Sequence, residues 1–176
     1  MTLARIAVQA GPIELLAGDP AAAERELRPA YEALERMENW GYVASVVPRL
    51  VDALLAQGRD DEGLRLTELV EPRLVPEDVD AQVGWRRVRA KLLARRGDLE
   101  EAEHLGRDAT MIAARTDYLD LRAQAAADLA EVLRLAGRPK ESESALKEAI
   151  RLYEEKGNVA APGRLRGLLA DSQLEV

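Results

Sequence analysis

The chain has 176 residues, of which 47% are hydrophobic and 32% are charged, as is typical of a folded globular protein. It has no cysteine, which excludes disulfides, thiolate chemistry and cysteine metal sites. The net charge of −7 argues against nucleic-acid binding, and no apolar window is long enough to cross a membrane, so we expect a cytoplasmic protein.

Helical patterns follow one another along the whole chain, and no useful stretch alternates as a strand would. Aromatic residues make up 3% and Phe is absent, so the core must consist mainly of Leu, Ala and Val, which suits closely packed helices. In chain order the predicted helices are about 3–17, 20–37, 42–57, 60–74, 80–96, 99–115, 119–136, 139–156 and 159–172. The connections are short, which predicts antiparallel neighbours.

Four glycines divide this pattern at regular intervals. Gly18, Gly58, Gly97 and Gly137 are separated by 40, 39 and 40 residues, and each comes at the end of a predicted helix. Glycine there can take the left-handed conformation that closes a helix. The next helix then begins at once, with Asp19 and Asp98 as predicted N-caps.

A fixed period of this length is typical of a helical solenoid. We predict one all-α domain over residues 1–176, a right-handed superhelix of four helix-turn-helix repeats and a C-terminal capping helix. The predicted repeats cover about 3–38, 41–75, 79–116 and 118–157, and the capping helix covers about 159–172.

Small residues at fixed offsets from the glycines resemble the tetratricopeptide repeat (TPR). The resemblance is carried by Val88-Arg-Ala90-Lys-Leu-Leu93-Ala-Arg-Arg-Gly97-Asp-Leu-Glu-Glu-Ala102 and by Leu129-Ala130-Glu-Val-Leu133-Arg-Leu-Ala-Gly137-Arg-Pro139. With "LLAGDPAAAERELRPAYEAL", these segments resemble the C-terminal repeat region of bacterial adenylate/guanylate cyclase-type proteins and multidomain transcriptional regulators. The period of about 40 departs from the usual 34, and Glu14 stands where a Leu is expected.

Residues suited to catalysis are scarce. The only histidine, His104, is interpreted as a solvated side chain, and none of the four serines has the context of a catalytic nucleophile. No glycine-rich phosphate loop occurs. We therefore predict no enzyme activity, no cofactor and no metal.

The resemblance implies that the first helix of each repeat lines a concave face that binds a protein or peptide. Residues 81–98 hold six Arg or Lys against one Asp, and we consider two interpretations of this basic helix. It could form an electropositive groove for an acidic peptide, or its cations could pair with acids of neighbouring repeats. Trp85 is a hot-spot candidate if exposed, although sealing a repeat junction suits it better. The residues predicted to bind the partner are Arg87, Lys91, Arg95, Arg134, Glu131, Asp52, Leu55, Leu135 and Trp85.

These features favour a non-catalytic, regulatory protein-interaction domain that binds a peptide or partner helix. The alternative is a spacer or dimerisation module of a larger signalling protein, of which this chain would be the tail. A small-molecule sensor is a third possibility but lacks convergent polar residues. A homodimer is expected through an apolar N-terminal stripe of Leu3, Ile6, Ala7, Ala10, Ile13 and Leu16.

Overall fold

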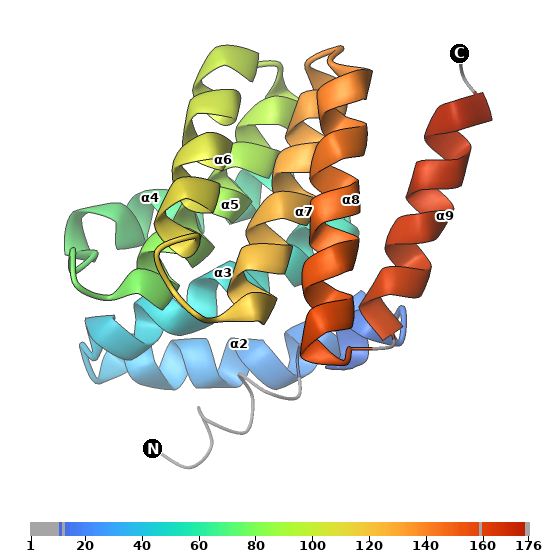
Figure 1. Ribbon diagram of the computed structural model, residues 1–176. Coiled ribbons are helices and arrows are strands. Elements are labelled where there is room, and N and C mark those ends of the chain that lie inside the picture. The colour runs from blue at the N-terminus through green and yellow to red at the C-terminus, as the bar shows by residue number, and fades with distance from the viewer. Residues whose placement is uncertain (1–10, 12, 159, 175–176) are drawn as a thin grey trace. The chain divides into compact units, whose positions relative to one another are not determined.

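The computed structural model of the protein describes residues 11, 13–158 and 160–174. Within these ranges the regular structure is helical throughout, without a strand (Figure 1). Residues 11 and 13–16 are helical, and the rest of the first predicted helix lies outside the described residues. The helices are α2 (Pro20–Arg36), α3 (Trp40–Ala56), α4 (Asp60–Val70), the 3₁₀ turn η1 (Glu71–Arg73), α5 (Val79–Arg96), α6 (Leu99–Ala113), α7 (Leu119–Leu135), α8 (Pro139–Lys156) and α9 (Ala160–Leu174).

The chain divides into two compact units, residues 1–88 and residues 89–176. Unit 1 contains α2, α3, α4, η1 and residues 79–88 of α5. Unit 2 contains residues 89–96 of α5 together with α6, α7, α8 and α9. The single domain predicted over residues 1–176 stays a prediction.

Helix ends fall at the predicted glycines. The φ angles of Gly18, Gly58, Gly97 and Gly137 are +82°, +71°, +98° and +71°. At each site the glycine N–H donates to the carbonyl three residues back, and the next N–H donates to the carbonyl five residues back. These two bonds define the Schellman motif, which satisfies carbonyls that the ending helix leaves without partners.

In unit 1, α3 packs against both α2 and α4. The centre of α3 consists of β-branched and Leu side chains that are fully buried, among them Val47, Leu50 and Leu54. Trp85 of α5 is 6% exposed and donates from Nε1 to the Thr67 carbonyl of α4 at 2.9 Å. A Cβ on Gly84 would lie 2.9 Å from Cγ of Pro48, so α5 can approach α3 this closely only with a glycine at position 84.

In unit 2, α7 and α8 form the most extensive helix pair, and they run side by side in Figure 1. Their shared core is rich in alanine, and Leu165 of α9 completes it. A Cβ on Gly106 of α6 would lie 3.0 Å from Leu129 of α7 and 3.9 Å from Ala90 of α5. Small residues therefore let the axes of these helices approach closely.

The structure differs from the prediction at several helix ends. α4 stops at Val70, four residues early, because Pro72 has no N–H to donate and the chain tightens into the 3₁₀ turn. α3 begins at Trp40, two residues early. Asp19 caps α2 by accepting from Ala22 N–H at 2.7 Å, as predicted. Asp98 is the N-cap residue of α6, as predicted, but its side chain makes no capping hydrogen bond.

Candidate functional site

We call α3, α5 and α7 the leading helices, because each opens a helix-turn-helix repeat. In unit 1, two salt bridges join α3 to α5. Arg87 donates to both carboxylate oxygens of Asp52, at 2.6 and 3.3 Å, and Nη1 of Arg49 lies 3.6 Å from Oδ2 of Asp80. The side chains of Arg87 and Asp52 are 8% and 18% exposed, so this pair is largely withdrawn from water.

In unit 2, two further salt bridges join α5 to α7. Nζ of Lys91 lies 3.0 Å from Oδ1 of Asp128, and Nη2 of Arg95 lies 3.1 Å from Oε1 of Glu131. The Lys91 pair is nearly buried, whereas the Arg95 pair is about one-third exposed. Within each unit, successive leading helices thus lie side by side and form one layer, which we call the leading-helix layer.

The predicted binding residues fall into three groups by exposure. Arg87, Lys91, Leu55 and Trp85 are buried. Arg95 and Arg134 are exposed, and Asp52, Glu131 and Leu135 are partly exposed. Trp85 is buried, so the condition of exposure set for its hot-spot role is not met, and its role in sealing a repeat junction stays a prediction. Whether these residues bind a partner stays a prediction.

Three cations of the basic helix have recorded carboxylate partners. Arg87, Lys91 and Arg95 each form a salt bridge to an acid on an adjacent leading helix, which is the arrangement of the second interpretation. These acids lie 35 to 37 residues away in sequence, close to one repeat. A search for acids three to five residues short of the period of about 40 would have found them.

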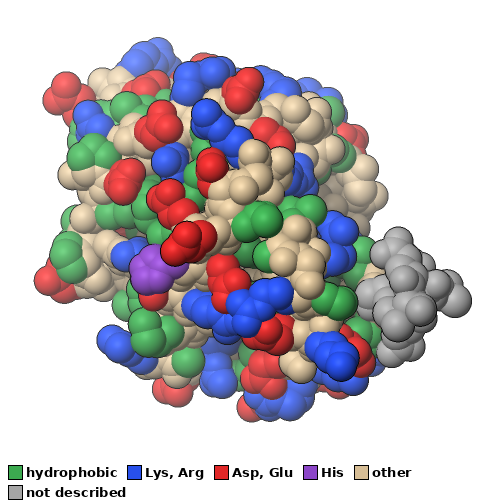
Figure 2. All heavy atoms as spheres, turned by 90° about the horizontal axis from the view of Figure 1, so that it is seen from above, with side chains coloured by type: hydrophobic (Ala, Val, Ile, Leu, Met, Phe, Trp, Pro, Cys, Tyr) green, Lys and Arg blue, Asp and Glu red, His purple; other side chains and the backbone are tan. Residues whose placement is uncertain are grey.

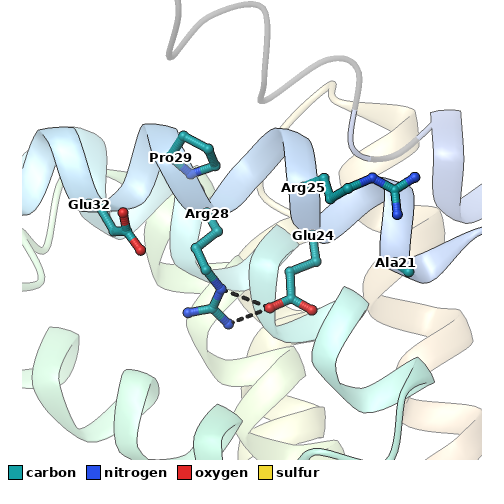
Figure 3. A pocket seen from close by; sticks show the side chains of 6 residues that line it. All are labelled: Ala21, Glu24, Arg25, Arg28, Pro29 and Glu32. Atoms are coloured by element: carbon teal, nitrogen blue, oxygen red, sulfur yellow. Dashed lines mark hydrogen bonds and ion pairs between the residues drawn. The ribbon is translucent and has the colours of Figure 1, made fainter.

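Sequence reasoning missed an ionic network in unit 1 that joins α2 and α4, the helices that close their repeats and that we call the second helices. Arg28 of α2 donates to Glu62 of α4 at 2.6 Å, and Arg59 donates back to Glu24 of α2 at 2.6 Å. Arg28 also bonds Glu24 within α2 (Figure 3). Burial works to raise the pKa of Glu24, but hydrogen bonds from Gln57, Arg28 and Arg59 outweigh it and hold the pKa below its usual range.

The same network recurs in unit 2. Arg107 of α6 donates to Glu141 of α8 at 2.9 Å, and Arg138 bonds back to Glu103 of α6. Hydrogen bonds from Arg138 and Arg107 lower the pKa of Glu103. Each residue of this second network follows its counterpart in unit 1 by 79 positions. The matching pairs are Glu24 and Glu103, Arg28 and Arg107, Arg59 and Arg138, and Glu62 and Glu141. A comparison of the sequence with itself at two repeat lengths would have found this match.

Two hollows among the described residues are open to solvent, and one of them, of about 630 Å³, is lined by residues 97–101 and His104. A shallow hollow of about 420 Å³ lies along α2 and is lined by Ala21, Glu24, Arg25, Arg28, Pro29 and Glu32 (Figure 3). On the face in Figure 2, acidic and basic side chains lie interspersed and do not separate into blocks of one sign. The side chain of His104 is 74% exposed and lies 3.6 Å from Asp108, in keeping with its interpretation as solvated.

Among the described residues, no group of three or more His, Cys, Asp or Glu side chains could hold a metal ion. None of the helices in that part of the chain combines the length and the apolar character that crossing a membrane requires.

Comparison with solved structures shows what the fold resembles. The crystal structure of BtubC (BKLC) from P. vanneervenii matches with a TM-score of 0.64 at 19% identity, over 91% of this chain and 66% of that one. The chain therefore spans slightly less than two thirds of that structure. The nearly identical TPR-like repeats of a candidate kinesin light chain from Podosopora anserina match with a TM-score of 0.56 at 17% identity, over 97% and 95%.

Comparison with sequences gives one match. No curated protein matches the chain in sequence. Residues 83–155 match the family model described as Tetratricopeptide repeat, and such repeats generally mediate interactions between proteins. The predicted all-α helical-repeat fold is thus confirmed, and residues 83–155 resemble the tetratricopeptide repeat in sequence.

Proposed function

We propose that the chain is a non-catalytic, regulatory interaction domain that binds a peptide or partner helix on its leading-helix layer. The observation that carries the proposal is the pairing of successive leading helices, Asp52 with Arg87 in unit 1 and Arg95 with Glu131 in unit 2. Within each unit, helices joined in this way present side chains from equivalent repeat positions on one surface. Stacked repeats offer such extended surfaces to partners.

In unit 2, exposed residues contact the partner directly, and a buried residue holds them in place. Arg134 is exposed, Leu135 is partly exposed, and both lie one helical turn from Glu131 on α7. In the proposed complex Arg134 donates to a carboxylate of the partner, and Leu135 packs against a neighbouring apolar side chain. Lys91 acts indirectly, because its salt bridge holds Asp128 and therefore α7 in place.

Photo-crosslinking from single positions tests this proposal. A photoreactive residue at position 135 is expected to capture one protein partner, and Arg134→Glu is expected to abolish the adduct. The matched control carries the same photoreactive residue at Ser144, which is exposed on α8. Equal adducts from both positions, or adducts that Arg134→Glu leaves unchanged, would contradict the proposed surface.

A second proposal, self-association in a larger signalling protein, rests on exposed apolar side chains before α2. Ile13 is 63% exposed and Leu16 is 50% exposed, whereas Leu3, Ile6, Ala7 and Ala10 of the predicted stripe lie outside the described residues. Sedimentation is expected to show a dimer that dissociates when Ile13 and Leu16 are both changed to Glu. A strict monomer at high concentration argues against this role.

A further inference from the structure

We infer that one end of unit 1 is a docking surface for an amphipathic segment of a partner protein in which Lys or Arg flank apolar side chains. The surface, which we call the aromatic end, comprises Met37, Trp40, Tyr42, Arg73 and Val75. It is formed by helix termini and turns, so it is separate from the leading-helix layer of the proposed function.

The topology of unit 1 brings these residues to the same end. Because α2, α3 and α4 are packed antiparallel, the α2–α3 turn and the α4–α5 connection both lie where α3 begins (Figure 1). Cζ of Arg73 lies 4.0 Å from the centroid of the Trp40 ring, which joins the two segments directly. Gln82 of α5 donates to the Val75 carbonyl at 3.0 Å and holds the connection in place.

The aromatic end exposes the residue types that dominate protein interfaces. Met37 is 73% exposed, Val75 is 50% exposed and Tyr42 is 38% exposed, and Trp40 is partly exposed. Single exposed apolar residues are ordinary, but here Met37, Tyr42 and Val75 belong to the same helix ends and turns as the Trp40 ring on which Arg73 stacks, in a chain with only two Trp and four Tyr. Trp, Tyr, Met and Arg are enriched in interfaces, and Trp, Tyr and Arg in hot spots.

The charges around the aromatic end indicate the chemistry of the partner. Glu38, Glu71 and Glu77 are exposed there. Of the nearby cations, Arg73 is stacked on Trp40, and Arg36 donates to the Glu32 carbonyl. Acids therefore outnumber cations at the rim, and a segment with basic flanks complements it.

The backbone at Glu38 adds an independent observation. Glu38 has a φ of +53°, a left-handed conformation that is costly for residues other than glycine. The same Schellman pattern closes α8, where glycine occupies the equivalent place as Gly157. A carboxylate kept at a strained position beside the exposed Met37 is consistent with a role in binding.

The test uses the full chain labelled with 5-fluorotryptophan, so that Trp40 and Trp85 each give a ¹⁹F resonance. The probe is an 18-residue helical peptide of Leu and Lys with Leu on one face, and its counterpart has Glu in place of every Lys. The Lys peptide is expected to shift the Trp40 resonance saturably and to leave that of buried Trp85 in place. Met37→Ser/Tyr42→Ser is expected to weaken binding at least about tenfold, the scale of a lost hot spot.

The matched control is Met111→Ser/Tyr118→Ser in unit 2, which removes two exposed side chains of the same types and is expected to leave the affinity unchanged. The inference is overturned if the Lys peptide produces no saturable shift, or if both double variants bind it equally. It is also overturned if the Glu peptide binds as tightly as the Lys peptide. A loss of self-association in Met37→Ser/Tyr42→Ser would overturn it too, since a second copy of the chain would then be the occupant. Because Arg134 and Leu135 are intact in both variants, failure here leaves the proposed function standing.

Discussion

Nζ of Lys91 lies 3.0 Å from Oδ1 of Asp128, and the two side chains are only 9% and 16% exposed. This pair joins the adjacent leading helices α5 and α7 of unit 2. Burying a charge is costly unless it is paired, so the removal of one member should be far more damaging than the replacement of both.

Lys91→Ala is expected to lower the free energy of unfolding by about 3 kcal/mol, the size seen when a buried ion pair loses one partner. Lys91→Leu/Asp128→Leu should recover most of that loss. Urea denaturation of the two variants measures both values. A loss below about 1 kcal/mol in Lys91→Ala would show that the pair is not energetically buried.

The Asp52–Arg87 pair predicts how charge reversal acts in unit 1. Arg87→Asp places two carboxylates against each other and is expected to prevent stable folding, because like charges in contact repel while buried. The swap Asp52→Arg/Arg87→Asp restores an opposite pair and should restore the helical circular dichroism signal and much of the thermal midpoint. If the single variant were as stable as the wild type, the salt bridge would have no structural role.

The two second-helix networks predict acid sensitivity. The pKa values of Glu24 and Glu103 are lowered in the folded state, so their contribution is fully present above the unfolded pKa of about 4.3. It is lost as pH falls below that value and through the folded pKa. In Glu24→Gln/Glu103→Gln, the thermal midpoint should therefore fall less between pH 5 and pH 2.5 than in the wild type. Parallel curves for the two proteins would contradict this assignment.

The positions of helix ends could be predicted because their cause is local. Each of the four period-setting glycines adopts the left-handed conformation that their spacing suggested. The Pro72 turn shows what this reasoning overlooked, since a proline signal within the fourth predicted helix was not used. The end of a helix depends on a few adjacent residues, such as glycine and proline, and can therefore be predicted from the sequence.

The salt bridges of the candidate site could not be predicted from local patterns, because they depend on packing between repeats. The basic character of residues 81–98 was evident, but the choice among nearby acids was not. That choice followed from Asp52, Asp128 and Glu131 lying on helices directly adjacent to α5. The burial of Leu55, which was expected to contact a partner, depends in the same way on the packing around α3.

Two equivalent helix ends predict that glycine is the more stable residue at each. Glu38→Gly is expected to raise the free energy of unfolding by about 0.5–1 kcal/mol, because relief of the left-handed strain exceeds the added entropy of the unfolded chain. Gly157→Ala should lower it by about 1 kcal/mol, because alanine must adopt the φ of +81° there. Chemical denaturation of the pair checks both signs. A destabilised Glu38→Gly would mean that the Glu38 side chain contributes more than its backbone costs.

Hydroxyl-radical footprinting of the chain, alone and with the partner captured from position 135, tests the central claim that the leading-helix layer binds. The account predicts that Leu135 is protected in the complex, while Met111 and Leu168, which are 52% and 50% exposed, are modified as before. Unchanged modification of Leu135, with protection confined to Met111 or Leu168, would place the partner elsewhere and contradict the account.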